Sequence, residues 1–83
     1  MLIYLQGGPK QIPLYVDPDD TIAIVKSKLF EYLRNNNMTV RNATKEKLKL
    51  SYGSKRLMDE QTLRNIGIDE EDSITVNVTY FAA

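Results

Sequence analysis

The chain has few side chains that could carry out chemistry. It contains neither His nor Cys, so the commonest acid–base group and the thiol nucleophile are both missing. A nucleophile would have to be a serine or threonine activated by a lysine or a carboxylate, and no supporting motif surrounds the serine candidates. The candidates are Ser27, Ser51, Ser54 and Ser73. Gly7-Gly8 is typical of a turn and not of a phosphate-binding loop. We therefore expect no enzymatic activity, no metal and no cofactor.

Length and composition indicate one globular domain. The 83 residues are 42% hydrophobic and 27% charged, and the formal net charge is zero. A zero net charge gives no overall attraction to nucleic acid or to a membrane surface. No apolar run approaches the roughly 20 residues of a membrane-spanning helix, and the N-terminus lacks the features of a signal peptide. We expect a monomeric domain of the cytoplasm or nucleus.

Hydrophobic patterning predicts the first elements. Residues 1–6 and 11–16 each place aliphatic residues at every second position and are joined by a Gly-rich turn, which predicts a β-hairpin. Pro13 cannot donate a ladder hydrogen bond, so the second strand should lie at a sheet edge. Apolar residues then recur every three or four positions, which predicts an amphipathic helix over 22–34 with Thr21 as its N-cap.

The second half predicts three more strands around a mixed sheet. Residues 38–47 are polar and weakly periodic, and we interpret them as a long loop. The strands expected are 48–52, a short one beginning at Leu57, and 73–80. The order β-β-α-β-β-β, with one main helix across a mixed sheet, predicts an α+β roll. The domain would span 1–81, with a loop insertion at about 35–47 and a tail at 82–83.

Two segments carry a resemblance to a known family. Asp17-Pro18-Asp19-Asp20-Thr21-Ile22 and Gly53-Ser54-Lys55-Arg56-Leu57 both resemble segments of the ubiquitin-like domain family, and the similarity extends over nearly the whole chain. The resemblance implies a β-grasp fold with aliphatic inward positions. Those positions are Ile3, Leu5, Ile12, Leu14, Val16, Ile22, Val25, Leu29, Leu50, Leu57, Leu63, Ile68, Ile74 and Val76.

The resemblance also bears on conjugation. Members that are attached to other proteins end in a basic tail and Gly-Gly, and the last carboxylate is activated. The matching positions are Ala82 and Ala83, preceded by Thr79-Tyr80-Phe81. We therefore expect a non-catalytic protein–protein interaction module that is not conjugated, as part of a longer protein or standing alone. The alternative is a protein modifier whose native Gly-Gly end is absent from or altered in this chain.

Two further site types follow from the resemblance. The apolar patch that most ubiquitin receptors bind corresponds to Gly7 or Gly8 in the turn and to Ser51, Thr75 and Asn77, none of which is a large apolar residue. We therefore expect weak binding to ordinary ubiquitin receptors. Lysines that match chain-linkage positions are Lys10, Lys26, Lys28 and Lys55. These lysines are alternatively ordinary surface residues that favour solubility.

Alternation points to another surface. Leu2 and Tyr4 should pair with Tyr15 and Pro13 on the outer face of the hairpin, where the fold does not require apolar residues. We expect these four to bind a partner protein, with Tyr80 and Phe81 extending the surface. The alternative is cross-strand packing that only stabilises the hairpin.

Charge is unevenly distributed along the chain. The basic residues Arg41, Lys45, Lys47, Lys49, Lys55 and Arg56 lie close together. Residues 59–72 carry acidic residues instead: Asp59, Glu60, Asp69, Glu70, Glu71 and Asp72. The basic group is either a solvated loop or a docking site for an acidic protein face. Binding to RNA is disfavoured because no stacking aromatic residues are interleaved in that stretch.

Overall fold

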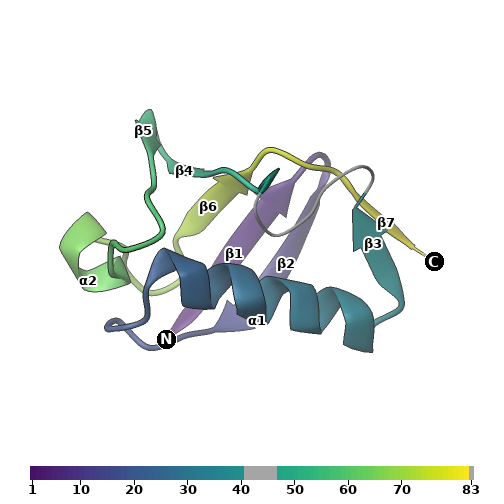
Figure 1. Ribbon diagram of the computed structural model, residues 1–83, viewed down its shortest axis with the longest axis horizontal. Helices are drawn as coiled ribbons and strands as arrows, with labels where there is room; N and C mark the ends of the chain where they lie inside the picture. The colour runs from purple at the N-terminus through teal and green to yellow at the C-terminus, as the bar shows by residue number, and fades with distance from the viewer. Residues whose placement is uncertain (41–46, 83) are drawn as a thin grey trace.

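The computed structural model describes residues 1–40 and 47–82. Its main sheet has five strands in the order β2-β1-β6-β4-β5. The strands are β1 (Leu2–Gly7), β2 (Lys10–Tyr15), β4 (Leu50–Tyr52), β5 (Lys55–Arg56) and β6 (Ser73–Val76). β1 and β6 run parallel and the other pairs antiparallel, so the sheet is mixed as predicted. Helix α1 (Ile22–Asn35) lies across one face of this sheet (Figure 1).

Pro13 lies where its missing N–H does no harm. The Met1 ammonium donates to the Val16 carbonyl oxygen, and the Val16 N–H donates back to the Met1 carbonyl oxygen. Hydrogen-bonded and non-hydrogen-bonded pairs alternate along an antiparallel ladder, so the Tyr4–Pro13 pair belongs to the non-hydrogen-bonded set. The Pro13 nitrogen therefore faces the open side of β2, which is an edge strand as expected.

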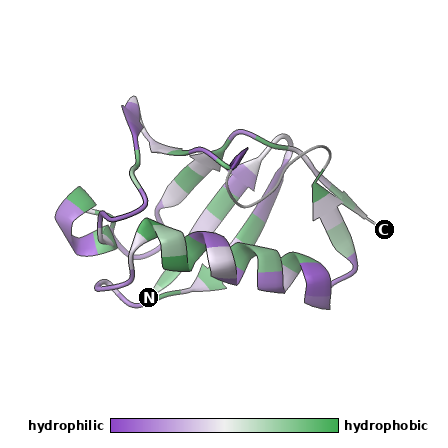
Figure 2. Cartoon of the chain, viewed as in Figure 1, coloured by the Kyte–Doolittle hydropathy of each residue, from purple (hydrophilic) through white to green (hydrophobic). Residues whose placement is uncertain are grey.

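The predicted core is confirmed. All fourteen aliphatic positions expected to point inward are buried, and α1 buries Ile22, Val25, Leu29 and Leu33 along one stripe. Figure 2 shows hydrophobic and hydrophilic residues alternating along this helix. Thr21 caps the helix as predicted, because its hydroxyl accepts a hydrogen bond from the Ile24 N–H. A short second helix, α2 (Leu63–Ile66), ends at Gly67, whose φ of +87° favours glycine.

The interpretation of residues 38–47 as a loop is wrong at its start. Met38–Val40 form a strand, β3, which pairs antiparallel with β7 (Tyr80–Ala82) in a separate two-stranded sheet. Ala82, which we expected to belong to a tail, is thus part of a strand opposite Met38. Two residues of the predicted basic group, Arg41 and Lys45, lie outside the described residues. Within the described ranges, none of the helices has the length and apolar character that crossing a membrane requires.

Candidate protein-binding surface

Four apolar side chains meet on the outer face of the hairpin. Leu2 pairs with Tyr15 and Tyr4 pairs with Pro13, as the alternation predicts. Tyr15 is 77% exposed and Pro13 is exposed, while Leu2 and Tyr4 are half-buried. Both pairs belong to the non-hydrogen-bonded set, whose side chains approach each other more closely. We call these four residues the hairpin patch.

An acidic loop borders the hairpin patch. Residues Asp69, Glu70, Glu71 and Asp72, which we call the acidic loop, lie between α2 and β6. The Leu2 N–H donates to the Glu70 carboxylate, and the Glu71 N–H donates to the Leu2 carbonyl oxygen over 2.7 Å. The Tyr4 N–H donates to the Asp72 carbonyl oxygen over 3.0 Å. Backbone hydrogen bonds therefore hold the loop against the first two apolar residues of the patch.

Asp72 also anchors the loop to strand β4, through Tyr52. Its carboxylate accepts hydrogen bonds from the Tyr52 hydroxyl at 2.7 Å and from the Asp69 N–H at 2.8 Å. Those two hydrogen bonds, with that from Tyr52 the stronger influence, lower the pKa of Asp72 below its usual value. The same contact raises the pKa of Tyr52. Asp72 thus ties the loop to β4, and its own carboxylate is ionised at neutral pH.

Tyr80 and Phe81 do not extend the hairpin patch, so that expectation is wrong. Tyr80 is 2% exposed, and its hydroxyl donates to the Leu5 carbonyl oxygen over 3.2 Å inside the core. Its ring packs against Gly7, where an added Cβ would come within 2.7 Å of it. Phe81 belongs to β7, whose first residue Tyr80 lies against Gly7 at the end of β1, whereas Leu2 begins β1. Sequence alternation alone does not place Tyr80 inward, because β6 ends at Val76 and Tyr80 begins β7 in the other sheet.

The positions that match the ubiquitin-receptor patch are polar in space as well as in sequence. Ser51 on β4 pairs with Thr75 on β6 across the outer face. Asn77 follows β6, and its side-chain oxygen accepts a hydrogen bond of 2.9 Å from the Lys49 N–H. In the turn, Gly8 is exposed while Gly7 is buried. The structure brings the strand positions together without forming an apolar surface.

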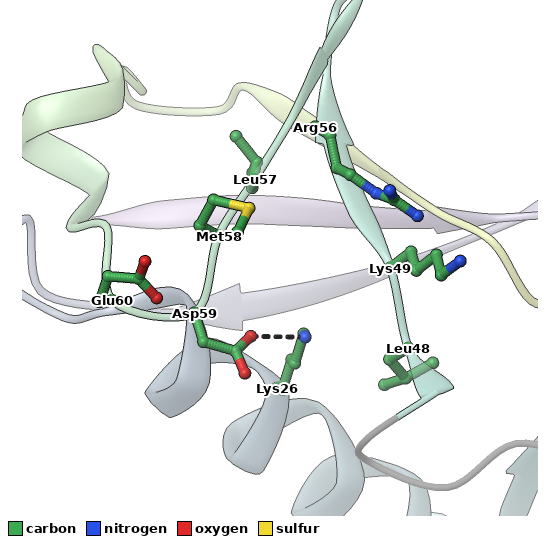
Figure 3. A pocket seen from close by; sticks show the side chains of 8 residues that line it. All are labelled: Lys26, Leu48, Lys49, Arg56, Leu57, Met58, Asp59 and Glu60. Carbon is green, nitrogen blue, oxygen red and sulfur yellow. Dashed lines mark hydrogen bonds and ion pairs between the residues drawn. The ribbon is translucent and has the colours of Figure 1, made fainter.

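The four lysines that match chain-linkage positions differ in their surroundings. Lys10 and Lys55 are exposed, in agreement with ordinary surface positions. Lys28 pairs with Asp20 at 2.7 Å. Lys26 is different, because it is buried and its ammonium lies 2.6 Å from the Asp59 carboxylate (Figure 3). For Lys26, the alternative of an ordinary surface lysine is therefore wrong, and its match to a chain-linkage position stays a prediction.

A shallow hollow of about 390 Å³ lies above the Lys26–Asp59 ion pair. Leu57 and the 52% exposed Met58 lie in its centre, with Lys49 and Arg56 on one side (Figure 3). Sequence reasoning missed Met58, because it occupies an irregular connection without periodicity. The basic group thus contributes at least two of its members to one rim of this hollow.

Comparison with known proteins agrees with the fold. A sequence model described as the ubiquitin family matches residues 3–80, nearly the whole chain. The comparison with individual curated proteins found no match to this chain.

Proposed function

Because this chain belongs to the ubiquitin family, we propose that it is a non-catalytic protein-binding module that works through its hairpin patch. The observation that supports this proposal is the 77% exposure of Tyr15 beside Leu2, Tyr4 and Pro13. Exposed aromatic residues in an apolar cluster gain most from burial against a partner, and Tyr is enriched at binding hot spots. The compartment that fits this role is the cytoplasm or the nucleus.

The backbone edge beside the patch is poorly suited to strand addition. Pro13 offers no N–H on the open side of β2, and the Tyr15 carbonyl oxygen accepts a hydrogen bond of 3.4 Å from Lys28. A partner that added a strand there would lack one donor and compete for one acceptor. The side-chain face of the hairpin therefore supports recognition better than its edge does.

The experiment compares Tyr15→Ala with Met58→Ala. Both residues are exposed and apolar, but they lie toward opposite edges of the sheet. Partners captured with the wild-type domain would be identified and their Kd values measured. Tyr15→Ala should weaken a direct partner roughly thirtyfold, a typical hot-spot effect, while stability changes by less than about 0.5 kcal/mol. Equal binding by Tyr15→Ala and wild type would remove the patch from consideration.

The alternative function is a protein modifier. Two observations weigh against it for the chain as written: Ala82 and Ala83 stand where Gly-Gly would be, and β7 pairs with β3. A tail held in a sheet cannot enter a narrow enzyme tunnel without breaking that pairing. Incubation with a ubiquitin-type activating enzyme and ATP should therefore give no thiol-labile adduct. Titration with a ubiquitin-associated domain should likewise give no shifts centred on Ser51 and Thr75.

A further inference from the structure

We propose that the hairpin patch and the acidic loop together bind a basic amphipathic segment of a partner protein. Apolar side chains of that segment would cover the patch, and its Lys or Arg side chains would face the loop. This inference rests on the proposed function and adds the charge and character of the partner.

The two surfaces form one continuous site. Leu2 contacts the acidic loop through both of its backbone groups, and Tyr4 contacts it through its N–H. Of these contacts, the first places the Glu70 carboxylate at the backbone of Leu2, and the others hold Glu71 and Asp72 against the same strand. A partner that covers Leu2 must therefore come close to the negative charge of Glu70.

The other side of the patch also carries acidic residues. Asp17 follows Tyr15 by two positions and is exposed, and its carboxylate accepts a 2.8 Å hydrogen bond from the Asp19 N–H. Lys28 lies beside Tyr15, but its charge is balanced by Asp20 at 2.7 Å. Asp17 thus adds an exposed carboxylate near Tyr15, the residue that pairs with Leu2.

None of the ion pairs in the described part of the chain involves the acidic loop. The three ion pairs found there join Lys26 to Asp59, Lys28 to Asp20 and Arg64 to Asp19. The nearest basic strand, β5, is separated from β1 by β6 and β4. Three strand spacings are about 14 Å, beyond the Debye length of about 8 Å at physiological ionic strength, so the basic residues of β5 act weakly on Leu2 and Tyr4. They lie nearer the loop, because Tyr52, whose hydroxyl binds Asp72, pairs with Lys55. The Met1 ammonium precedes Leu2 and is bonded to the Val16 carbonyl oxygen, whereas the Glu70 carboxylate accepts a hydrogen bond from the Leu2 N–H itself.

This charge selects among partners. Phosphate groups of nucleic acids and of anionic lipids would be repelled, as would an acidic protein face. A basic segment gains faster association from the same field, and apolar burial at Tyr15 slows its dissociation. Only a partner with both features uses the whole site.

A pair of peptides tests the proposal. One is a short amphipathic helical peptide built of Leu and Lys, and the other has Glu in place of every Lys. Each is titrated into the ¹⁵N-labelled domain at low and at physiological ionic strength. The Leu/Lys peptide should shift the amides of Leu2, Tyr4, Tyr15 and Glu70, and its affinity should fall as salt rises. The Leu/Glu peptide should leave these amides unchanged.

Matched variants separate the charge from the apolar contact. The double variant Asp69→Asn/Glu71→Gln keeps the Glu70 and Asp72 carboxylates that hold the loop, and it should weaken the Leu/Lys peptide roughly fivefold. Glu60→Gln changes an exposed charge near the opposite edge and should have no effect. Tyr15→Ala should weaken binding at either ionic strength.

The outcomes of the two proposals are distinguishable. Two results would overturn the basic-partner inference and leave the patch as a binding surface. The first is peptide binding that depends on Tyr15 but not on Asp69, Glu71 or salt. The second is equal binding of the Leu/Glu and Leu/Lys peptides. If neither peptide shifts the patch amides, the inference also fails. Unchanged binding of a captured partner by Tyr15→Ala removes the proposed function itself.

Discussion

The Tyr80 hydroxyl donates a hydrogen bond of 3.2 Å to the carbonyl oxygen of Leu5, a residue 75 positions earlier in the chain. This contact joins the C-terminal strand β7 to the centre of β1. Burial raises the pKa of the Tyr80 hydroxyl, so the group stays protonated and remains a donor. Tyr80, the first residue of β7, is therefore packed into the core of this domain.

Tyr80→Phe isolates this hydrogen bond. Removal of the hydroxyl leaves the ring in place and should reduce the free energy of unfolding by about 1 kcal/mol. Tyr80→Ala also removes the ring and should cost about 3–5 kcal/mol. Urea denaturation followed by circular dichroism measures both. Tyr15→Phe, at an exposed position, is the control and should be neutral; a similar loss there would show that the burial of Tyr80 is not the cause.

Gly7→Ala tests the packing that admits Tyr80. An added Cβ would lie 2.6 Å from the Val78 carbonyl oxygen and 2.7 Å from the Tyr80 ring, so one of them must move. Overpacking of this kind typically costs about 1–3 kcal/mol. Hydrogen exchange should increase most at Met38–Val40 and Tyr80–Ala82, because that sheet depends on the position of β7. Exchange that rises equally in β1 and β2 would contradict a local effect.

Local sequence signals predicted much of this fold. Apolar period and spacing identified the hairpin and the helix, and Thr21 marked the start of the helix because capping is a local interaction. Pro13 predicted an edge strand because proline cannot donate to the ladder. These features depend on residues within a few positions of one another. The position of the acidic loop beside the hairpin patch was not predicted, because it depends on a contact between residues 2 and 70.

The sheet of β3 and β7 escaped prediction for the same reason. Met38–Val40 is too short for a clear period, and its partner lies about forty residues later. Lys26 was also misplaced, since only the fold brings Asp59 within 2.6 Å of its ammonium. The burial of a charged side chain depends on a partner that no local pattern reveals.

Acid should destabilise the domain partly through Asp72. Its pKa is lowered in the folded state, chiefly by the Tyr52 hydroxyl, so the ionised form is favoured by folding. This contribution is complete above about pH 4, near the unfolded pKa, and is lost as pH falls through the folded pKa. Tyr52→Phe should lower stability at neutral pH and flatten its decline below about pH 4. Urea denaturation across that range provides the measurement, with Tyr15→Phe as the control; identical acid profiles for Tyr52→Phe and wild type would exclude this contact.

Lys26 should react differently from the other lysines. Its side chain is 9% exposed and is paired with Asp59, whereas Lys10 and Lys55 are exposed. Acylation of Lys26 therefore requires local opening, and its rate with an N-hydroxysuccinimide ester should be on the order of tenfold below that of Lys55. Asp59→Asn removes the ion pair, and it should reduce the free energy of unfolding by about 1 kcal/mol because the Asp59 side chain is 60% exposed. The same change should raise the acylation rate of Lys26. Peptide mass spectrometry resolves each site. If Lys26 reacts as fast as Lys55 in the wild-type domain, the ion pair does not protect it, and Lys26 becomes as accessible for chain linkage as the surface lysines.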